Sequence, residues 1–488
     1  MQTRRKKWLC VAYAFPPINR SGTHRTAAFV RHLARMGWDA EVITVEPRGE
    51  PIDMALAKQI PPITKVHCTR WVDLVEIAKR SPGGSNTRNV VADSVKASNP
   101  RSAHRSWRDW CSRLLKTPDS RLGWIPFGVA KGIQSIRRSR PDVLYSTSPY
   151  ASAHLIAWTV HRMFRIPWVA DFRDPWIANP YATANHPSLQ RWNAGLERLV
   201  IRTASRVVCN TTTLRDSLCR RYPNVSAQCV VIPNGVDLDL FSETAPVKRS
   251  SQDPFQLLHA GQFYGPRRPH ELFEALRFAC DQLSRGGIRP RLTLLGSDSY
   301  DGTPLLALAE KAGVADAVSI GGLRSHDQTL ASLRAADALV LLGSSGAGSQ
   351  LQVPNKLYEY MGAKRPILAV MPADSPALRM LADAKAEAVI CDPSSAPDIA
   401  DGMVRLALGH HDRPINPWSG VERFDRAHRA AELCDLFNSL NRNGRESTVK
   451  PATASTNHVG RMGSFAARAR WSSPVHDRKA PVSHPAES

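Results

Sequence analysis

Two aspartates bracket an arginine in the segment "PWVADFRDPWI", residues 167–177. Asp171 and Asp174 follow a short apolar run that is typical of a buried strand, and Arg173 lies between them. Carboxylates at the end of a buried strand can act as general acids or bases, or they can hold a polar substrate. A solvated salt bridge at the strand end is the alternative, and this segment alone does not decide between the two.

A glycine in the first half also has a suitable position for ligand binding. The segment "FPPINRSGTHR" follows the first apolar run, and Gly22 opens the helix that comes after it. Backbone N–H groups at the start of a helix favour an anion or another polar ligand. An ordinary turn between a strand and a helix is the structural alternative.

The second half contains a glycine and two arginines in a similar context. In "HAGQFYGPRRPHELFEAL", Gly261 lies at a strand end, and Arg267 and Arg268 come just before a helix. The paired donors of an arginine suit a diphosphate group. A solvent-exposed arginine without a ligand is the alternative for one of the two.

The segment "GSSGAGSQLQVPNKLYEYMGAKRPILA" carries the strongest motif of the chain. A Gly/Ser loop over 343–348 leads to a helix that we expect to begin at Pro354. Lys356 and Glu359 are three residues apart and therefore share one face of its first turn. A lysine beside helix-start amides suits a phosphate, and a carboxylate suits the hydroxyls of a ribose. A salt bridge between the two side chains is the alternative.

Several well-known ligand motifs are absent from the sequence. Neither half has G-x-G-x-x-G after its first predicted strand, and G-x-x-x-x-G-K-[ST] does not occur, which argues against a dinucleotide dehydrogenase and a P-loop nucleotidase. The acidic "DLD" at 237–239 falls in a predicted linker rather than after a strand. We therefore predict no metal site and no cofactor.

The pattern of apolar segments predicts an α/β protein with two Rossmann-like, doubly wound domains that face each other across a cleft. Short apolar runs alternate with amphipathic helices between about 254 and 408, which indicates six parallel strands covered on both faces. The first half repeats this scheme, with its first strand predicted over Trp8 to Phe15. We predict an N-terminal Rossmann-like domain over 1–236 with a basic aromatic insert at about 80–140, a C-terminal Rossmann-like domain over 237–412, a helical segment over 413–445, and a disordered basic tail over 446–488.

Composition places the chain among globular proteins. Hydrophobic residues make up 42% and charged residues 22% of the 488 positions, and no apolar run approaches the ~20 residues of a membrane-spanning helix. The basic N-terminus precedes only a short apolar stretch, unlike a signal peptide. The nine cysteines are spread singly, which favours buried thiols in a reducing compartment. We expect a cytoplasmic protein.

The net charge of +22 is unevenly distributed and suggests a polyanionic partner. Residues 101–140 hold ten Lys or Arg against two Asp, and the segment "SWRDWCSRLLK" at 106–116 places Trp and Leu at helical spacing. Such a helix can lie on an anionic membrane surface, although a core-packed helix with a solvated basic face fits equally well. No nucleic-acid recognition module is evident, so we expect no nucleic-acid partner.

Taken in order, the motifs resemble those of retaining glycosyltransferases of family 4, which have the GT-B fold. The resemblance covers residues 8 to about 440 and rests on "YAFPP", "PDSRLGWIPFGVAKG", "PDVLYSTSPYASAHL", "PWVADFRDPW", "VIPNGVD", "GQFYGPRRP" and "VPNKLYEYMGAKRPIL". It implies transfer of a sugar from a nucleotide-diphosphate sugar to a lipid-linked or saccharide acceptor without a metal ion. Members similar to this chain act in bacterial surface-polysaccharide or glycolipid synthesis, which would place it at the inner face of the cell membrane.

The resemblance also implies roles for the candidate residues. Gly22 would approach the donor phosphates or the acceptor, and Asp171 or Asp174 would contact the transferred sugar or act as acid or base. Lys356 and Arg267 of the second half would neutralise the diphosphate, with Arg268 as the alternative to Arg267 and Gly261 beside them. Glu359 would hold the ribose.

One position departs from the family pattern. Family members often carry two glutamates separated by seven residues, of which the second matches Glu359; the position of the first is Leu351 here. Either Gln352 or the Gly/Ser loop takes over its contact with the donor sugar, or the sugar differs. Two other functions stay open: a GT-B sugar-nucleotide epimerase, and a basic nucleic-acid-binding protein without catalytic activity. The basic aromatic insert favours transfer, because an epimerase needs no second substrate.

Overall fold

The structure is a computed structural model, and it describes residues 4–74, 76–77, 113–177, 187–242, 253–265, 267–343, 351, 353–409 and 418–446. Three predicted features lie outside these ranges: the Trp-containing part of the 106–116 segment, the loop after Gly343 together with Gln352, and the basic tail. Residues 1–444 form one compact unit, so the two sheets described below belong to the same body. None of the described helices is long and apolar enough to cross a membrane.

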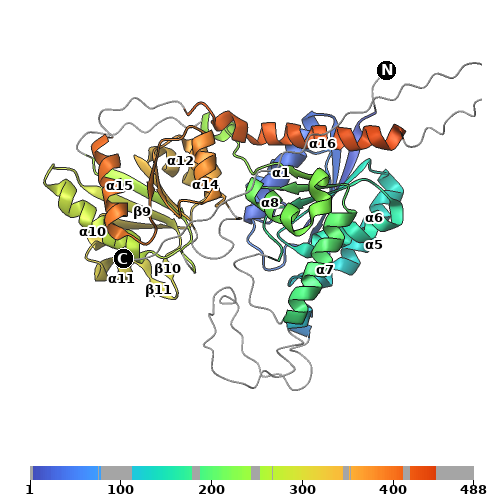
Figure 1. Ribbon diagram of the computed structural model, residues 1–488, viewed down its shortest axis with the longest axis horizontal. Coiled ribbons are helices and arrows are strands. Elements are labelled where there is room, and N and C mark those ends of the chain that lie inside the picture. The colour runs from blue at the N-terminus through green and yellow to red at the C-terminus, as the bar shows by residue number, and fades with distance from the viewer. Residues whose placement is uncertain are drawn as a thin grey trace, which may run out of the picture. The chain divides into compact units, whose positions relative to one another are not determined.

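The first half forms a parallel sheet of seven strands in the order β3-β2-β1-β4-β5-β6-β7 (Figure 1). The first strand lies two to three residues earlier than the sequence predicted, because its pairing with β2 begins at Lys6. The chain leaves the sheet before Pro16 and Pro17, which have no N–H to donate to a neighbouring strand. The strands are β1 Lys6–Ala12, β2 Trp38–Val45, β3 Lys65–Thr69, β4 Val143–Thr147, β5 Trp168–Phe172, β6 Arg206–Cys209 and β7 Cys229–Val231.

Helices cover both faces of the first sheet, which explains why its strands are apolar on both sides. On one face, α5, α6, α7 and α8 pack around Leu9, Val11 and Leu144. On the other face, α1 and the C-terminal helix α16 (Arg426–Glu446) pack around Trp8 and Val42. The helices of this half are α1 Ser21–Arg35, α2 Met54–Lys58, α5 Ile125–Ser139, α6 Ala151–Phe164, α7 Pro187–Thr203, α8 Thr212–Arg221 and α9 Asp239–Ser242, with 3-10 turns over Leu122–Trp124 and Pro223–Gln228.

The second half forms a parallel sheet of six strands in the order β12-β9-β8-β13-β14-β15, so the predicted doubly wound arrangement is confirmed for both halves. A small hairpin, β10 and β11, lies beside it. The predicted domain bounds at 236 and 412 stay a prediction. The strands are β8 Phe255–Gly261, β9 Pro290–Gly296, β10 Ser299–Tyr300, β11 Thr303–Pro304, β12 Val318–Gly322, β13 Ala338–Leu342, β14 Ile367–Val370 and β15 Ala388–Cys391.

Two helix layers enclose the second sheet as well. Helices α10 and α15 lie side by side on one face and share a core with α11 (Figure 1). Helices α12, α13 and α14 cover the other face. The helices are α10 His270–Ser284, α11 Leu305–Lys311, α12 His326–Ala335, α13 Lys356–Ala363, α14 Pro376–Asp383, α15 Ala396–Gly409 and α16 Arg426–Glu446, with 3-10 turns over Ala315–Ala317 and Val421–Phe424.

The chain passes between the halves twice, and the two passages are bonded to each other. Val236 donates its N–H to the carbonyl of Phe424 at 2.9 Å, and its own carbonyl accepts from the N–H of Arg426 at 2.9 Å. Helix α16 then returns to the first sheet, where Phe437 packs against Trp8 and Trp38. The segment that leaves the first sheet and the segment that returns to it are therefore fixed to one another at Val236.

Candidate functional site

The candidate residues gather at the carboxyl edges of the two sheets. In each sheet the strand order reverses at the first strand, since β1 lies between β2 and β4 and β8 lies between β9 and β13. Ligands of open α/β sheets bind at such a reversal, outside the carboxyl ends of the strands. Gly22 follows β1, Asp171 lies near the end of β5, Asp174 follows that strand, Gly261 ends β8, and Lys356 follows β13.

Lys356 begins helix α13 and reaches the end of β8. A Cβ added to Gly261 would lie 2.1 Å from Lys356 Nζ, so only glycine leaves room for the ammonium group at this strand end. Burial lowers the pKa of Lys356 to about 7, and repulsion from the nearby guanidinium of Arg267 acts in the same direction, although Glu359 opposes it. An anion bound beside Lys356 would raise this pKa, so binding would favour the protonated ammonium.

A buried histidine holds this lysine in place. His259 has no exposed surface, and its Nδ1 lies 2.9 Å from the carbonyl of Val340. Because a carbonyl only accepts, Nδ1 carries the proton and Nε2 keeps its lone pair for Lys356 Nζ at 3.2 Å. Burial, assisted by the charge of Lys356, keeps the pKa of His259 well below its usual value, so the ring is neutral.

Glu359 contacts a histidine rather than Lys356. Its Oε1 lies 3.0 Å from Nε2 of His326 at the start of α12, and the ring of His326 lies 5.2 Å from that of His24 of α1. Burial opposes ionisation of Glu359, but the hydrogen bond from His326 outweighs it and the pKa of the carboxyl is lowered. The alternative of a salt bridge between Lys356 and Glu359 is therefore not what the structure shows, and both groups face the same pocket.

That pocket has a volume of about 200 Å³ and takes its lining from both halves. His24 and Arg25 come from α1, and Lys356 and Glu359 come from α13. Asn234, Gly235, Asn355, Tyr358 and Arg426 complete it. Burial lowers the pKa of His24 to about 4, with further lowering by Arg426 and His326, so this histidine is neutral at physiological pH.

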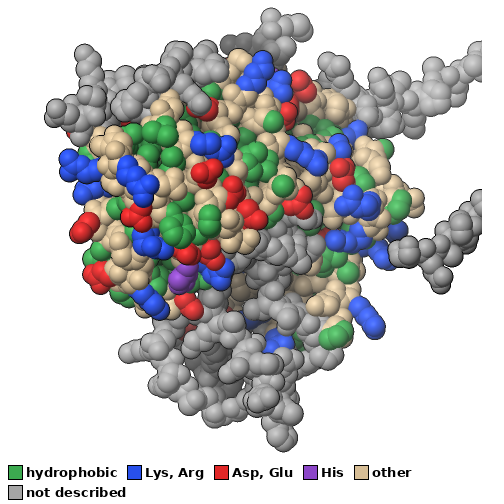
Figure 2. Space-filling model, turned by 60° about the vertical axis from the view of Figure 1, so that its left-hand side comes forward, with side chains coloured by type: hydrophobic (Ala, Val, Ile, Leu, Met, Phe, Trp, Pro, Cys, Tyr) green, Lys and Arg blue, Asp and Glu red, His purple; other side chains and the backbone are tan. Residues whose placement is uncertain are grey.

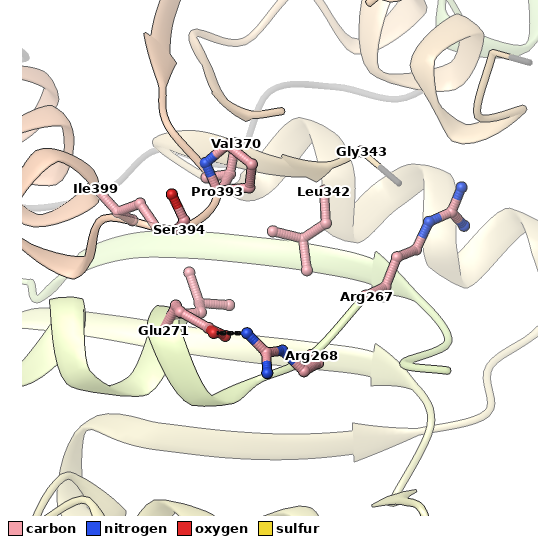
Figure 3. A pocket seen from close by; sticks show the side chains of 10 residues that line it. Arg267, Arg268, Glu271, Leu342, Gly343, Val370, Pro393, Ser394 and Ile399 are labelled. Atoms are coloured by element: carbon pink, nitrogen blue, oxygen red, sulfur yellow. Dashed lines mark hydrogen bonds and ion pairs between the residues drawn. The ribbon is translucent and has the colours of Figure 1, made fainter. Parts of the chain in front are cut away.

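The two arginines of the second half differ in their contacts. A cavity of about 430 Å³ at the carboxyl edge is lined by both, with Leu342 and Ser394 opposite. Arg268 forms an ion pair with Glu271, whereas Arg267 points away from that pair (Figure 3). Arg267 donates to the hydroxyl of Tyr264 at 2.9 Å and lies 5.1 Å from the centre of its ring. The charge of Arg267 lowers the pKa of Lys356, so the two cations lie near each other. Arg267 therefore fits the predicted diphosphate contact better than Arg268.

The two aspartates of the opening segment have different surroundings. Asp171 has no exposed surface, and its oxygens accept from Arg25, from Tyr145 Oη at 2.6 Å and from Thr147 Oγ1 at 2.9 Å. Burial opposes its ionisation, but the charge and hydrogen bonds of Arg25 outweigh this and lower the pKa of Asp171. We therefore correct the catalytic assignment of Asp171, since a carboxylate with four donors and no exposure cannot reach a substrate.

Asp174 is half-buried, and burial raises the pKa of its carboxyl although the neighbouring Arg173 lowers it. The guanidinium of Arg173 occupies the space beside Gly22, where an added Cβ would lie 2.4 Å from Nη1. The glycine thus accommodates a cation at the amino end of α1, as Gly261 accommodates Lys356. The sequence predicted a ligand beside Gly22 and did not predict this contact with Arg173.

Comparison with known proteins supports the fold and gives a family match for part of the chain. Residues 89–240 match the model of Glycosyltransferase Family 4. A sucrose-phosphate synthase from Thermosynechococcus elongatus is similar with a TM-score of 0.59 at 16% identity, over 90% of this chain and 100% of that one. Anabaena HepE in complex with UDP is similar with a TM-score of 0.59 at 15% identity, over 89% and 100%. The chain therefore has the GT-B fold, and its residues 89–240 are similar to Glycosyltransferase Family 4.

A curated relative matches a shorter part of this GT-B protein. D-inositol 3-phosphate glycosyltransferase from Actinosynnema mirum is 31% identical over 156 residues, which are 30% of this chain. The match spans 37% of the relative's own length.

Sequence reasoning missed several groups of this GT-B site. The histidines at 24, 259 and 326 stand alone in the sequence, without metal-ligand spacing, and only the fold brings them to Lys356 and Glu359. Arg25 follows Gly22 by three residues, so the "SGTHR" motif contained a signal for it. Leu351, where the family pattern led us to expect a glutamate, lies with its carbonyl 3.5 Å from Thr211 Oγ1 of the first half.

Proposed function

We propose that the chain is a retaining glycosyltransferase that moves a sugar from a nucleotide-diphosphate sugar to a lipid-linked or saccharide acceptor. The observation that carries the proposal is the placement of Lys356 against Gly261 at the start of α13, with Glu359 in the same turn. Structures of Anabaena HepE hold UDP and UDP-glucose, which supports a nucleotide-sugar donor for a chain of this fold.

The chemistry of leaving-group departure explains why cations gather here. When the bond between the sugar and the diphosphate breaks, negative charge builds on the outer phosphate, and fixed positive groups aimed at it stabilise the transition state. Lys356 and Arg267 supply two such groups, and the first N–H groups of α13 add the positive end of a helix dipole. Glu359, ionised and held by His326, is suited to accept hydrogen bonds from the ribose hydroxyls.

The acceptor side of the proposal rests on the first half. We propose that Asp174 faces the acceptor and the transferred sugar, because it is the half-buried carboxylate at the end of β5 whereas Asp171 is enclosed. We further propose a role in cell-surface polysaccharide or glycolipid synthesis, in the cytoplasm and at the inner face of the membrane.

A panel of nucleotide sugars tests the proposed activity. We expect at least one to raise the unfolding temperature of the protein and then to be hydrolysed slowly, or transferred when a saccharide acceptor is added, equally well in EDTA because no metal is required. A nucleotide sugar whose only product is an epimer would indicate the epimerase alternative. Stabilisation by nucleic acid, with no response to any nucleotide sugar, would contradict the transferase.

Membrane attachment through residues 101–140 is a separate proposal. On the face shown in Figure 2, basic side chains are interspersed with acidic ones, so the excess charge does not gather there. Within the described part of 101–140, helix α5 exposes Phe127 together with Arg137 and Arg138. An exposed aromatic ring and exposed arginines on one helix suit an anionic lipid surface.

We predict that the protein co-sediments with vesicles containing phosphatidylglycerol and is released by about 0.5 M salt, because added ions screen surface charge. Replacing Arg137 and Arg138 with glutamate should lower the bound fraction at low salt, while the same change at Lys385, an exposed cation of the second half, should not. Equal binding to neutral vesicles would contradict the proposal.

A further inference from the structure

Arg25 lies on α1 with 5% of its surface exposed, and all five of its N–H donors are used. Two of them bind the carboxylate of Asp171, at 3.2 Å from Nε and 3.1 Å from Nη2. The other three reach the segment that leaves the first sheet: the carbonyl of Ile232 at 2.8 Å, the carbonyl of Pro233 at 2.6 Å and Oδ1 of Asn234 at 3.2 Å. A single guanidinium thus fixes three elements to each other.

The next bond continues this connection to the second half. Nδ2 of Asn234 donates to Oδ1 of Asn355 at 2.8 Å. Asn355 is the residue before Lys356, and its own side chain makes no capping bond to α13. Its amide is therefore committed to Asn234 rather than to its helix, and the start of α13 is connected through Asn234 and Arg25 to the end of β5.

We propose that Arg25 is a positioning residue that sets where Lys356 and Glu359 stand relative to the first sheet, through Asn234 and Asn355. The inference rests on the proposed function, because it concerns the placement of the donor-binding helix opposite Asp174. Groups that must meet in a transfer reaction lose about 100-fold in rate when they are misplaced by about 1 Å. Arg25 would therefore affect the rate of transfer without contacting the reacting atoms.

Only an arginine meets the geometry at this position. A lysine keeps the charge beside Asp171 but has three donors in place of five and no planar fork, so some of the acceptors at Asp171, Ile232, Pro233 and Asn234 would be left without a donor. Arg25→Lys is therefore the informative change: it retains the buried ion pair and loses part of the connection to the linker.

Hydrogen exchange tests the connection without any ligand. In Arg25→Lys we expect the amides of residues 353–360, which belong to the second half, to exchange at least about fivefold faster than in the wild type, because local opening of α13 becomes easier. Arg35→Lys, an exposed cation on the same helix, is the matched control and should leave that segment unchanged. Unchanged exchange in Arg25→Lys would overturn the proposal.

Kinetics then separate positioning from simple loss of stability. Asn355→Ala removes the last bond of the connection without touching the buried pair of Arg25 and Asp171, so the unfolding temperature should stay near that of the wild type. We expect hydrolysis of UDP-glucose to fall about tenfold or more while the dissociation constant of UDP stays within about threefold. Wild-type hydrolysis in both Asn355→Ala and Arg25→Lys would also overturn the proposal. A wild type that binds no nucleotide would instead refute the proposed function, and the exchange measurement would still decide the role of Arg25.

Discussion

Replacing Lys356 with alanine should weaken the binding of UDP-glucose by about 10- to 100-fold. A hydrogen bond to a charged group contributes roughly 1.5–3 kcal/mol, and the variant removes the ammonium that Gly261 and His259 hold at the end of β8. Calorimetry with UDP-glucose measures the change. Lys364→Ala is the matched control, since Lys364 lies at the other end of the same helix and pairs with Glu422 at 3.6 Å. Equal weakening by both variants would mean that the effect is not local to the helix start.

The affinity of the wild type for UDP-glucose should also depend on pH through Lys356. Burial lowers the pKa of Lys356 to about 7 in the unliganded protein, and we propose that an anionic diphosphate binds its protonated form. Affinity should therefore be highest below pH 7 and should fall by up to about tenfold per unit above it, with about half a proton taken up on binding at pH 7. UDP-glucose suits the measurement because its diphosphate does not titrate in this range. In Lys356→Ala the slope should disappear, and a wild-type affinity that is flat between pH 6 and 8.5 would contradict the assignment.

Spacing along the chain predicted both sheets and the residues at the start of α13, because those features are local. Lys356 and Glu359 are one helical turn apart, and the apolar runs of the strands report burial directly. The partners of these residues are not local: His259 lies 97 positions before Lys356, and His326 lies 33 positions before Glu359. A lone histidine in an apolar strand looks like a core residue until the fold places a lysine beside it.

The same limit explains why the sequence could not rank the two aspartates. Asp171 and Asp174 are three residues apart and have similar neighbours, so no local pattern separates them. The difference comes from Arg25, which is 146 positions from Asp171 and binds it with two of its donors. The buried ion pair with Arg25 compensates the charge of Asp171 inside the protein. Asp174 is therefore the carboxylate at the edge of the sheet.

Replacing Asp174 with asparagine should lower turnover of UDP-glucose by about 100-fold and change the dissociation constant of UDP by less than about threefold. A positioned acid or base contributes roughly 10²–10⁴ to a rate, and asparagine keeps the shape of the side chain while removing its ability to exchange a proton. Burial raises the pKa of the Asp174 carboxyl, which brings it closer to working pH than an ordinary aspartate. Initial rates with UDP-glucose, together with calorimetry on UDP, give the two quantities.

Asp171→Asn provides the matched comparison. We expect it to lose folding stability, whereas Asp174→Asn should lose turnover. Removing the charge of Asp171 leaves the guanidinium of Arg25 buried without its carboxylate, and breaking a buried pair in this way costs about 3–5 kcal/mol of folding stability. The unfolding temperature should therefore fall in Asp171→Asn and stay close to the wild type in Asp174→Asn, where the side chain is half-buried. Full turnover in Asp174→Asn would exclude it as the acid or base. Since Asp171 is enclosed, we would then assign the acceptor's proton to the leaving diphosphate, which we propose Lys356 and Arg267 hold.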